Sequence, residues 1–324
     1  RHHAGHGGGE RGRRALRHDA DMDYETVAEA FLAPSAEGQR RSPEVGSHPA
    51  RRLRDAVEPL ATHGWWSRPA NEAMAALGLD FFAGYVAGRA AALGDPPAEV
   101  VGATFAVFEP GFLASTWERA RATAGRDEVL RAREEGTVAS LEAILGDADG
   151  EAVERVGAAL RRAVATLDAT GRPLFSGLGS LPWPTVPLGV LWRGCELVRE
   201  HRGDSHVAVC VAAGLDPVSM TVLTELWLGM PSGSYLATRG YGTDALEGAL
   251  ERFEALGFVE DGMFTGEGRA YRAELERRTD ALQQGLVDAL GDDLDEVLSR
   301  CDEWSAAVVA AGAFPPDPLK RAAG

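Results

Sequence analysis

Lysine is nearly absent from this chain, since it occurs once, at Lys320, among 33 basic residues. With so much alanine and glycine, this preference for arginine is typical of a GC-rich bacterial coding sequence. The basic residues are outnumbered by 49 acidic ones, which leaves a formal net charge of -16. An acidic chain repels a phosphate backbone unless its cations gather on one face. The composition therefore argues against DNA as the default partner.

Cysteines and long apolar runs are also scarce. The three cysteines, Cys195, Cys210 and Cys301, are too few and too scattered for a disulfide framework or a zinc knuckle, so we expect buried, reduced thiols. No apolar run approaches the roughly 18–20 residues of a membrane span. The polar, Gly-rich N-terminal stretch lacks a signal-peptide pattern. These absences predict a cytoplasmic protein without a membrane partner.

What is present is helical periodicity over most of the 324 residues, which are enough for two domains. Leu53, Val57 and Leu60 begin a series of amphipathic stretches that predicts a mainly α fold. We divide the chain into a disordered tail at 1–48 with a short helix at 24–32, an α-helical bundle at 49–169, a Gly/Pro-rich linker at 170–187, a winged helix-turn-helix at 188–290, and a C-terminal helix and tail at 291–324.

The winged helix-turn-helix is predicted from the order of its start and stop signals. We expect helices at 188–200, 205–213, 217–228 and 244–256, then a hairpin, then a long helix from 266. The helix starts are marked by Asp204, Asp216, an Asp244/Glu247 capping box and Thr265, and the stops by Gly214 and Gly257. Asp261-Gly262, between Phe258-Val259 and Met263-Phe264, predicts the two-residue turn of the wing.

Several segments carry a family resemblance. The stretch ALERFEALGFVEDGMFTGEGRA resembles the end of a MarR-like winged helix. The elements EPL at 58–60, ALGLDFFAGYVAGRAAALG at 76–94, GRPLF at 171–175, LPWP at 181–184 and REHRGDSHVAVCVAAGL at 199–215 resemble a bacterial helix-turn-helix family of uncharacterised function. The resemblance covers most of the chain and implies the fold better than an activity. It also implies a histidine after the EPL element, where this chain has Ala61, with His63 two positions on.

The expected recognition helix is poorly suited to reading DNA. Its exposed face presents Glu247, Glu251 and Glu254 against Arg252, and the wing tip is again acidic, at Glu260-Asp261. Carboxylates at these places repel phosphates. Three arginines compensate in part: Arg239, Arg269 and Arg272. We therefore expect a degenerate winged helix used for packing or for a partner, and keep a DNA-binding transcriptional regulator as an alternative.

The motif His201-Arg202-Gly203-Asp204-Ser205-His206 is a candidate catalytic or metal site. With a helix break at Gly203, His201 would follow a helix C-terminus, which favours the imidazolium, and His206 would lie in a first turn, which favours the neutral ring. Two histidines and Asp204 would suit a divalent first-row metal. The simpler interpretation is that Asp204 caps a helix and the histidines form hydrogen bonds across the junction.

Polar groups within the apolar helices of the bundle are candidate ligand-binding residues. Arg89 is expected to pair with a buried carboxylate such as Glu109, and Trp66 and Tyr85 belong to an aromatic concentration that is core or part of a ligand pocket. His63 is the remaining candidate. A bundle joined to a winged helix commonly leaves a pocket at the seam.

Known catalytic motifs are absent: there is no Walker loop, G-x-S-x-G or H-E-x-x-H. The preferred hypothesis is thus a small-molecule-binding or regulatory protein. The alternative is a metal-dependent or His-based enzyme of a biosynthetic pathway, with its site near His201 to His206. A homodimer is a further expectation for the assembly.

Overall fold

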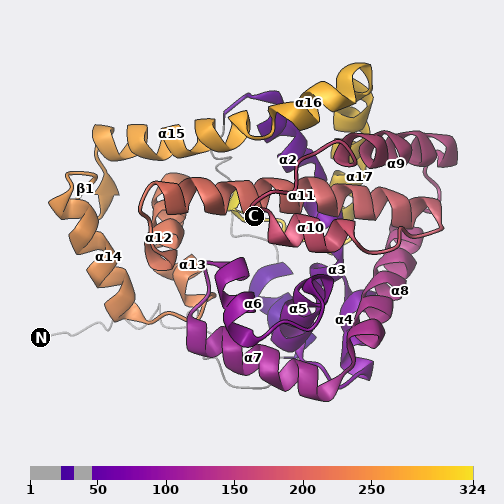
Figure 1. The fold of residues 1–324 in the computed structure, drawn as a ribbon, viewed down its shortest axis with the longest axis horizontal. Helices are drawn as coiled ribbons and strands as arrows, with labels where there is room; N and C mark the ends of the chain where they lie inside the picture. Colours follow the sequence, from indigo (N-terminus) through magenta and orange to yellow (C-terminus); the bar gives the residue numbers. More distant parts are fainter. Residues whose placement is uncertain (1–22, 33–45, 324) are drawn as a thin grey trace, which may run out of the picture.

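The computed structural model describes residues 23–32 and 46–323, and these residues form a mainly helical protein with one two-stranded sheet (Figure 1). The expected short helix at 24–32 is present as α1 (Tyr24–Val27) followed by a π-helical turn (Ala28–Leu32). Residues 1–22 and 33–45 of the predicted N-terminal tail lie outside the described residues. Among the described residues no single helix is long and apolar enough to cross a membrane. The bent pair of helices α11 (Pro187–Ala212) and α12 (Pro217–Leu228) would qualify by length and composition.

The region 49–169 is helical, as predicted. Its helices are α2 (Pro49–Ala61), α3 (His63–Trp66), α4 (Arg68–Ala76), α5 (Phe81–Ala90), α6 (Ala98–Phe105), α7 (Pro110–Thr123), α8 (Arg126–Leu145) and α9 (Gly150–Val164), with a 3₁₀ turn at Ala91–Leu93. The segment expected to be a linker contains α10 (Pro173–Gly179), whose Phe175 and Leu178 belong to the same core as α2 and α9. Apolar burial thus incorporates this segment into the bundle.

The second half begins with α11 (Pro187–Ala212). It continues through α12 (Pro217–Leu228), α13 (Ser234–Ala237), α14 (Thr243–Ala255), the hairpin of β1 (Val259–Glu260) and β2 (Met263–Phe264), and α15 (Gly266–Ala281). The chain then forms α16 (Gln284–Leu290), a 3₁₀ turn (Gly291–Asp293), α17 (Leu294–Ala310) and α18 (Pro318–Ala323). α17 returns to pack against α2 and α9, so the C-terminal part completes the bundle core.

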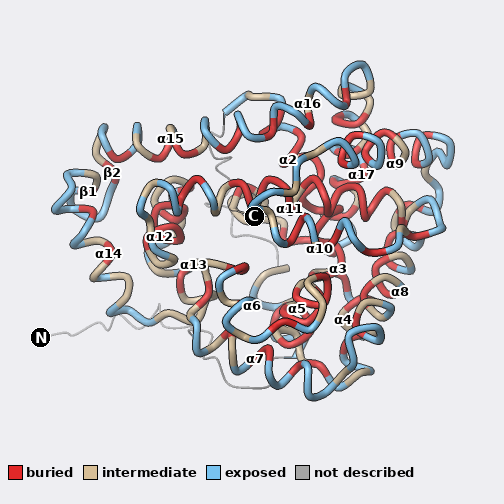
Figure 2. Tube along the Cα trace, viewed as in Figure 1, coloured by how far each residue is buried: buried red, intermediate tan, exposed pale blue. Residues whose placement is uncertain are grey.

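α11 is the central element, and it corrects the sequence-based boundaries. The break expected at Gly203, between helices at 188–200 and 205–213, does not exist, because α11 is continuous from Pro187 to Ala212. Its first half buries Leu191 and Trp192 in the bundle core. Its second half buries Val209 in a separate core with residues of α12 to α15, the segment 217–281 that contains the hairpin and that we call the winged part. Figure 2 shows that most of α11 is buried. Burial at both ends outweighs the roughly 1 kcal/mol that a mid-helix glycine costs.

Local signals of the winged part are otherwise found where the sequence places them. The Asp216 side chain accepts from the backbone N–H of Ser219, and the Thr265 hydroxyl accepts from that of Gly268. The turn residues Asp261 and Gly262 have φ of 51° and 71°, as a two-residue turn with left-handed backbone requires. The Asp244/Glu247 capping box is wrong, because the N-cap of α14 is Gly242, two residues before Asp244.

Candidate ligand cavity

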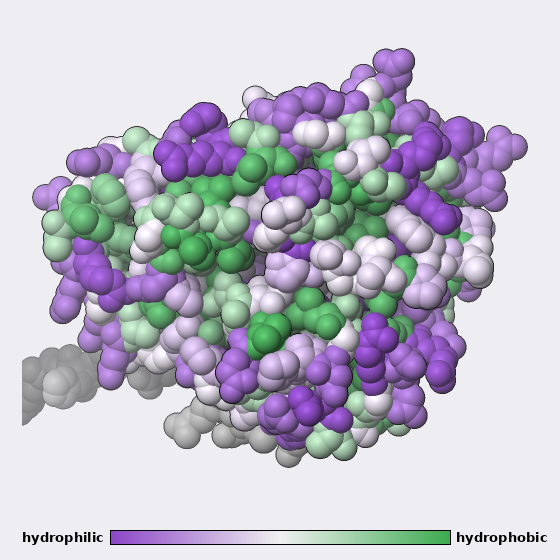
Figure 3. Space-filling view, viewed as in Figure 1, coloured by the Kyte–Doolittle hydropathy of each residue, from purple (hydrophilic) through white to green (hydrophobic). Residues whose placement is uncertain are grey.

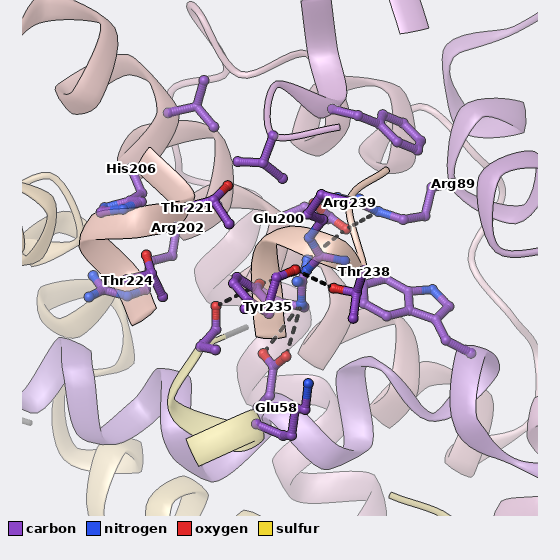
Figure 4. Close-up of a pocket in the computed structure, with 18 of the residues that line it drawn as sticks. Glu58, Arg89, Glu200, Arg202, His206, Thr221, Thr224, Tyr235, Thr238 and Arg239 are labelled. Carbon is purple, nitrogen blue, oxygen red and sulfur yellow. Dashed lines mark hydrogen bonds and ion pairs between the residues drawn. The ribbon is translucent and has the colours of Figure 1, made fainter. Parts of the chain in front are cut away.

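A cavity of about 240 Å³ lies at the seam between the bundle and the winged part. Its walls come from α2, α5 and α11, from α12 and α15, from the loop after α13, and from α18. Figure 4 shows labelled side chains converging on it from α2, α5, α11 and α12 and from α13 with the loop that follows it. The expectation of a pocket at the seam therefore has a structural counterpart.

One wall is aromatic. It combines the helices α3, α5 and α6 with the loop that follows α6, and its rings are Trp65, Trp66, Phe81, Tyr85, Phe105 and Phe108. Neighbouring rings pack at centroid distances of 6.0 Å for Trp66–Phe81 and 5.9 Å for Tyr85–Phe108. This wall can hold the apolar body of a small molecule, since most ligand sites are lined by apolar and aromatic groups.

The charged side chains around the cavity are mainly cationic, in contrast to the chain as a whole. Six arginines line it and each is in an ion pair: Arg51, Arg54, Arg89, Arg199, Arg202 and Arg272. Two further cations, Arg239 and Lys320, bring the total to eight, against the four carboxylates Glu58, Glu200, Asp204 and Glu276. A chain of net charge -16 has thus concentrated positive charge at this one place.

Arg89 does not pair with Glu109, as the sequence had led us to expect. Its guanidinium binds Glu200 of α11 at 3.0 and 3.2 Å and donates to the Tyr85 hydroxyl at 2.9 Å. Burial opposes ionisation of Glu200, but Arg89 and Arg199 outweigh burial and lower its pKa. Glu109 instead caps α7, where it accepts from the backbone N–H of Gly111 and Phe112. As the N-cap, Glu109 satisfies backbone N–H groups in the first turn of α7.

A second cluster of charges joins the cavity to the winged part. Glu276 of α15 accepts from Arg51, Arg202 and Arg272 at 3.3, 2.8 and 2.7 Å. Burial raises the pKa of Glu276, yet the three arginines together bring it well below its usual value. Arg51 and Arg272 also lie over the ring of Trp227 on α12, at 5.3 and 4.2 Å from its centroid. Arginines of α2, α11 and α15 thus contact the carboxylate of Glu276, and Trp227 of α12 packs against two of these arginines.

The residues of the His201–His206 motif are separated by the continuous helix. His206 and Asp204 line the cavity, whereas His201 points to Gln283, with Nδ1 at 2.7 Å from Oε1. Nδ1 of His206 lies 3.0 Å from the Thr279 hydroxyl, and burial lowers its pKa to about 4. Burial also lowers the pKa of His201, so the imidazolium expected at a helix C-terminus is not favoured.

Asp204 caps a helix, but not the one expected. Its Oδ2 accepts from the backbone N–H of Phe175 at 3.0 Å, in the first turn of α10. Burial, followed by the nearby charge of Glu200, raises the pKa of Asp204 to about 7. A carboxyl that titrates near neutrality therefore lies at the cavity wall.

The other predicted site residues divide between the cavity and the core. Arg89, Trp66 and Tyr85 line the cavity, while Glu109 and His63 do not. His63 is fully buried in the bundle, with Nε2 at 2.9 Å from the Ser140 hydroxyl and a pKa that burial lowers to about 4. Within the part of the chain that the structure describes, no group of three or more His, Cys, Asp or Glu side chains is placed to hold a metal. The divalent metal remains a prediction.

Our sequence-based predictions did not include four residues that line the cavity, Arg54, Glu58, Tyr235 and Lys320. They named Arg239 only as a possible contact to DNA. These residues lie on α2, on or after α13, and on α18, and their spacing follows no motif. Glu58 belongs to the EPL element, and Lys320 is the one lysine of the chain, which are the two signals that were available.

The face expected to read DNA is exposed and acidic. Glu247, Glu251 and Glu254 are exposed on α14, and the exposed Arg252 is paired with Asp216 at 3.1 Å. Arg272 is buried against Glu276 and Trp227, so it is not available to phosphates. Figure 3 shows apolar side chains gathered over the hairpin and α12 on one side of the molecule. The exposed, acidic face predicted for α14 is therefore present in the structure.

Comparison with known proteins gives one match. A model described as a helix-turn-helix family matches residues 50–315, which spans the bundle, the cavity and the winged part. No curated protein and no solved structure matches the chain.

Proposed function

Because the chain belongs to this helix-turn-helix family, we propose that it is a regulatory protein whose winged helix-turn-helix responds to a small molecule bound in the seam cavity. The observation that carries the proposal is the cavity itself, with an aromatic wall on the bundle and a cationic lining shared with the winged part. Such a lining recognises a small molecule in two ways, by apolar contact and by charge.

Gly203 of α11 lines the cavity. A Cβ built there would meet a single neighbour within 4 Å, the Oε2 of Glu200 at 3.8 Å. Other glycines of the same helix are tightly packed, as at Gly194, where a Cβ would lie 2.8 Å from the Leu160 side chain. A large side chain at position 203 would therefore extend into open space at the cavity, whereas one at position 194 would not fit.

The regulatory part of the proposal rests on which helices a ligand would touch. Thr221 and Thr224 of α12 and Arg272 and Glu276 of α15 line the cavity, and α15 begins directly after the hairpin. A ligand that displaces one arginine from Glu276 would change the packing of α12 against α15. Because the exposed face of α14 is acidic, we expect the output to be a changed protein surface, and DNA binding is the less favoured output.

The proposal is tested with the uncharged dye N-phenyl-naphthylamine, which fluoresces in apolar sites. We expect saturable binding to the full chain, retained in Gly203→Ala and lost in Gly203→Phe, whose ring would fill the cavity. Circular dichroism establishes that both variants are folded, and Val207→Phe serves as a second blocking variant because Val207 also lines the cavity. Equal dye binding by all four proteins would contradict the proposal.

A second candidate is an enzyme that uses Asp204 for acid–base catalysis at the cavity wall. The observation that favours it is the pKa of about 7 for a carboxyl at the cavity wall, since a catalytic acid or base works best near the ambient pH. If this candidate holds, a turnover found by screening small carboxylates and amides would be lost in Asp204→Asn while dye binding persists. Unchanged turnover in that variant would exclude it.

A further inference from the structure

Two of the eight cations around the cavity differ from the rest. Within the described chain, six arginines lie within 4.0 Å of a carboxylate, while no carboxylate lies that close to Arg239 or Lys320. These two cations come from distant places in the sequence, the loop after α13 and the helix α18. Their convergence is therefore a property of the fold.

Arg239 is held in place by aromatic rings. Its guanidinium lies 4.8 Å from the centroid of Phe108 and 4.4 Å from that of Tyr235, and Nη2 donates to the Tyr235 hydroxyl at 2.6 Å. Its Nε is buried and has no hydrogen-bond partner. Figure 4 draws Arg239 and Tyr235 together in the middle of the view. The guanidinium is thus oriented, yet part of its donor capacity is unused.

Lys320 approaches the same tyrosine from α18. Its Nζ lies 5.6 Å from the ring centroid of Tyr235 and 4.8 Å from that of Phe31. Burial, and next the charge of Arg239, lower its pKa to about 8, while the charges of Asp317 and Glu225 act in the opposite direction. Arg239 and Lys320 therefore repel each other in a partly enclosed place.

Hydrogen bonds to the backbone hold the loop that carries Arg239 in position at the cavity. Glu225 of α12 accepts from three backbone N–H groups around α13, those of Gly233, Tyr235 and Leu236, at 2.6–2.7 Å. The carbonyl of Arg239 accepts from the backbone N–H of Glu109 at 2.8 Å, which attaches the loop to the bundle. The carboxylate of Glu225 is used by these bonds and does not neutralise the cation pair at contact distance.

We propose that Arg239 and Lys320 form the anion-recognition site of the cavity and that its ligand carries a carboxylate, sulfonate or phosphate group on an apolar, ring-bearing body. This inference rests on the proposed function. A preorganised pair of cations without a counter-charge gains most from an anion placed between them, because hydrogen bonds between ionised partners are the strong ones. The rings of Tyr235 and Phe108 lie beside the pair, so the anionic group and an apolar body would fit together.

The test compares two dyes that share one ring system and differ in charge. The full chain is titrated with the anionic dye anilinonaphthalene sulfonate and with its uncharged parent, N-phenyl-naphthylamine. We expect the sulfonate to bind about tenfold tighter or more, as one charge-assisted bond implies. Arg239→Gln removes this advantage and leaves the affinity for the neutral dye unchanged. Arg239→Lys restores part of the advantage, and Arg277→Gln on the exposed side of α15 changes neither dye.

The outcomes separate this inference from the proposed function. If both dyes bind with equal affinity, or if Arg239→Gln weakens both equally, the cavity binds small molecules without recognising an anion and the inference is wrong. If neither dye binds, both the inference and the proposed function fail. Lys320→Gln provides an independent variant, and an unchanged preference for the sulfonate in both Arg239→Gln and Lys320→Gln would also overturn the inference.

Discussion

Glu200 of α11 holds Arg89 of α5 through two contacts, Nη2–Oε2 at 3.0 Å and Nε–Oε1 at 3.2 Å. Both side chains are about nine-tenths buried, and the pair joins helices that lie far apart in the sequence. Arg199 also contacts Glu200, at 3.1 Å, and it forms an ion pair with Glu58 of α2. A series of ion pairs therefore connects α2, α5 and α11 around the cavity.

Removing one partner from this series of ion pairs is expected to destabilise the protein. Glu200→Gln should lower the free energy of unfolding by about 3 kcal/mol, because it leaves the buried Arg89 without its counter-charge. Urea denaturation measures the change. The matched control is Glu303→Gln, which breaks the exposed pair with Arg300 at 2.9 Å and should cost about 0–1 kcal/mol. Similar costs for the two variants would mean that the Arg89 pair is solvated.

Two glycines of α11 are expected to respond in opposite directions to alanine. Gly203→Ala should stabilise the protein by about 0.5–1 kcal/mol, because the added methyl group meets only Glu200 at 3.8 Å and the helix gains propensity. Gly194→Ala should destabilise it, because the Cβ would lie 2.8 Å from that of Leu160. Thermal unfolding of both variants measures the two signs. A loss of stability in Gly203→Ala would show that α11 is strained at this point.

Asp204 should make a distinct contribution to the dependence of stability on pH. Its pKa in the folded protein is about 7, above the ordinary value of 3.8, so the folded state binds more protons than the unfolded state between these values. Stability from this group is therefore present below about pH 4 and is lost as the pH rises to about 7. His63 and His206, with pKa values lowered to about 4, act in the opposite direction.

For this reason the measurement is a difference between two proteins. The stability of Asp204→Asn relative to the unchanged chain should increase as the pH rises from about 4 to 7 and should level off above that range. Chemical denaturation at a series of pH values gives the difference. A difference that does not vary with pH would contradict the raised pKa of Asp204.

Duplex DNA should bind weakly to the full chain. We expect a Kd above about 10 μM at physiological salt with a shallow salt dependence, because the exposed face of α14 presents carboxylates. Glu247→Lys combined with Glu251→Lys should increase the affinity and steepen the salt dependence by about two phosphate contacts. Fluorescence anisotropy with a random duplex measures both. Tight and salt-sensitive binding by the unchanged chain would favour the transcriptional-regulator alternative.

The features that the sequence determined by itself are local. Asp216 and Thr265 cap the helices that follow them, Gly257 has a φ of 74° after α14, and Asp261-Gly262 forms the turn of the hairpin. Each depends on a few neighbouring residues, because a cap or a left-handed backbone position is satisfied within one turn of the chain. The mainly helical fold follows in the same way from periodicity.

The features that only the tertiary structure decided depend on which helices meet. Gly203 and Asp204 resemble a helix break and a new start, but burial of α11 in two cores keeps the helix continuous and directs Asp204 to α10. Arg89 pairs with Glu200 rather than Glu109, and Arg239 and Lys320 lie over the same ring of Tyr235, because packed helices bring these groups together. The total apolar area that many helices bury sets these positions, and no short stretch of sequence contains that total.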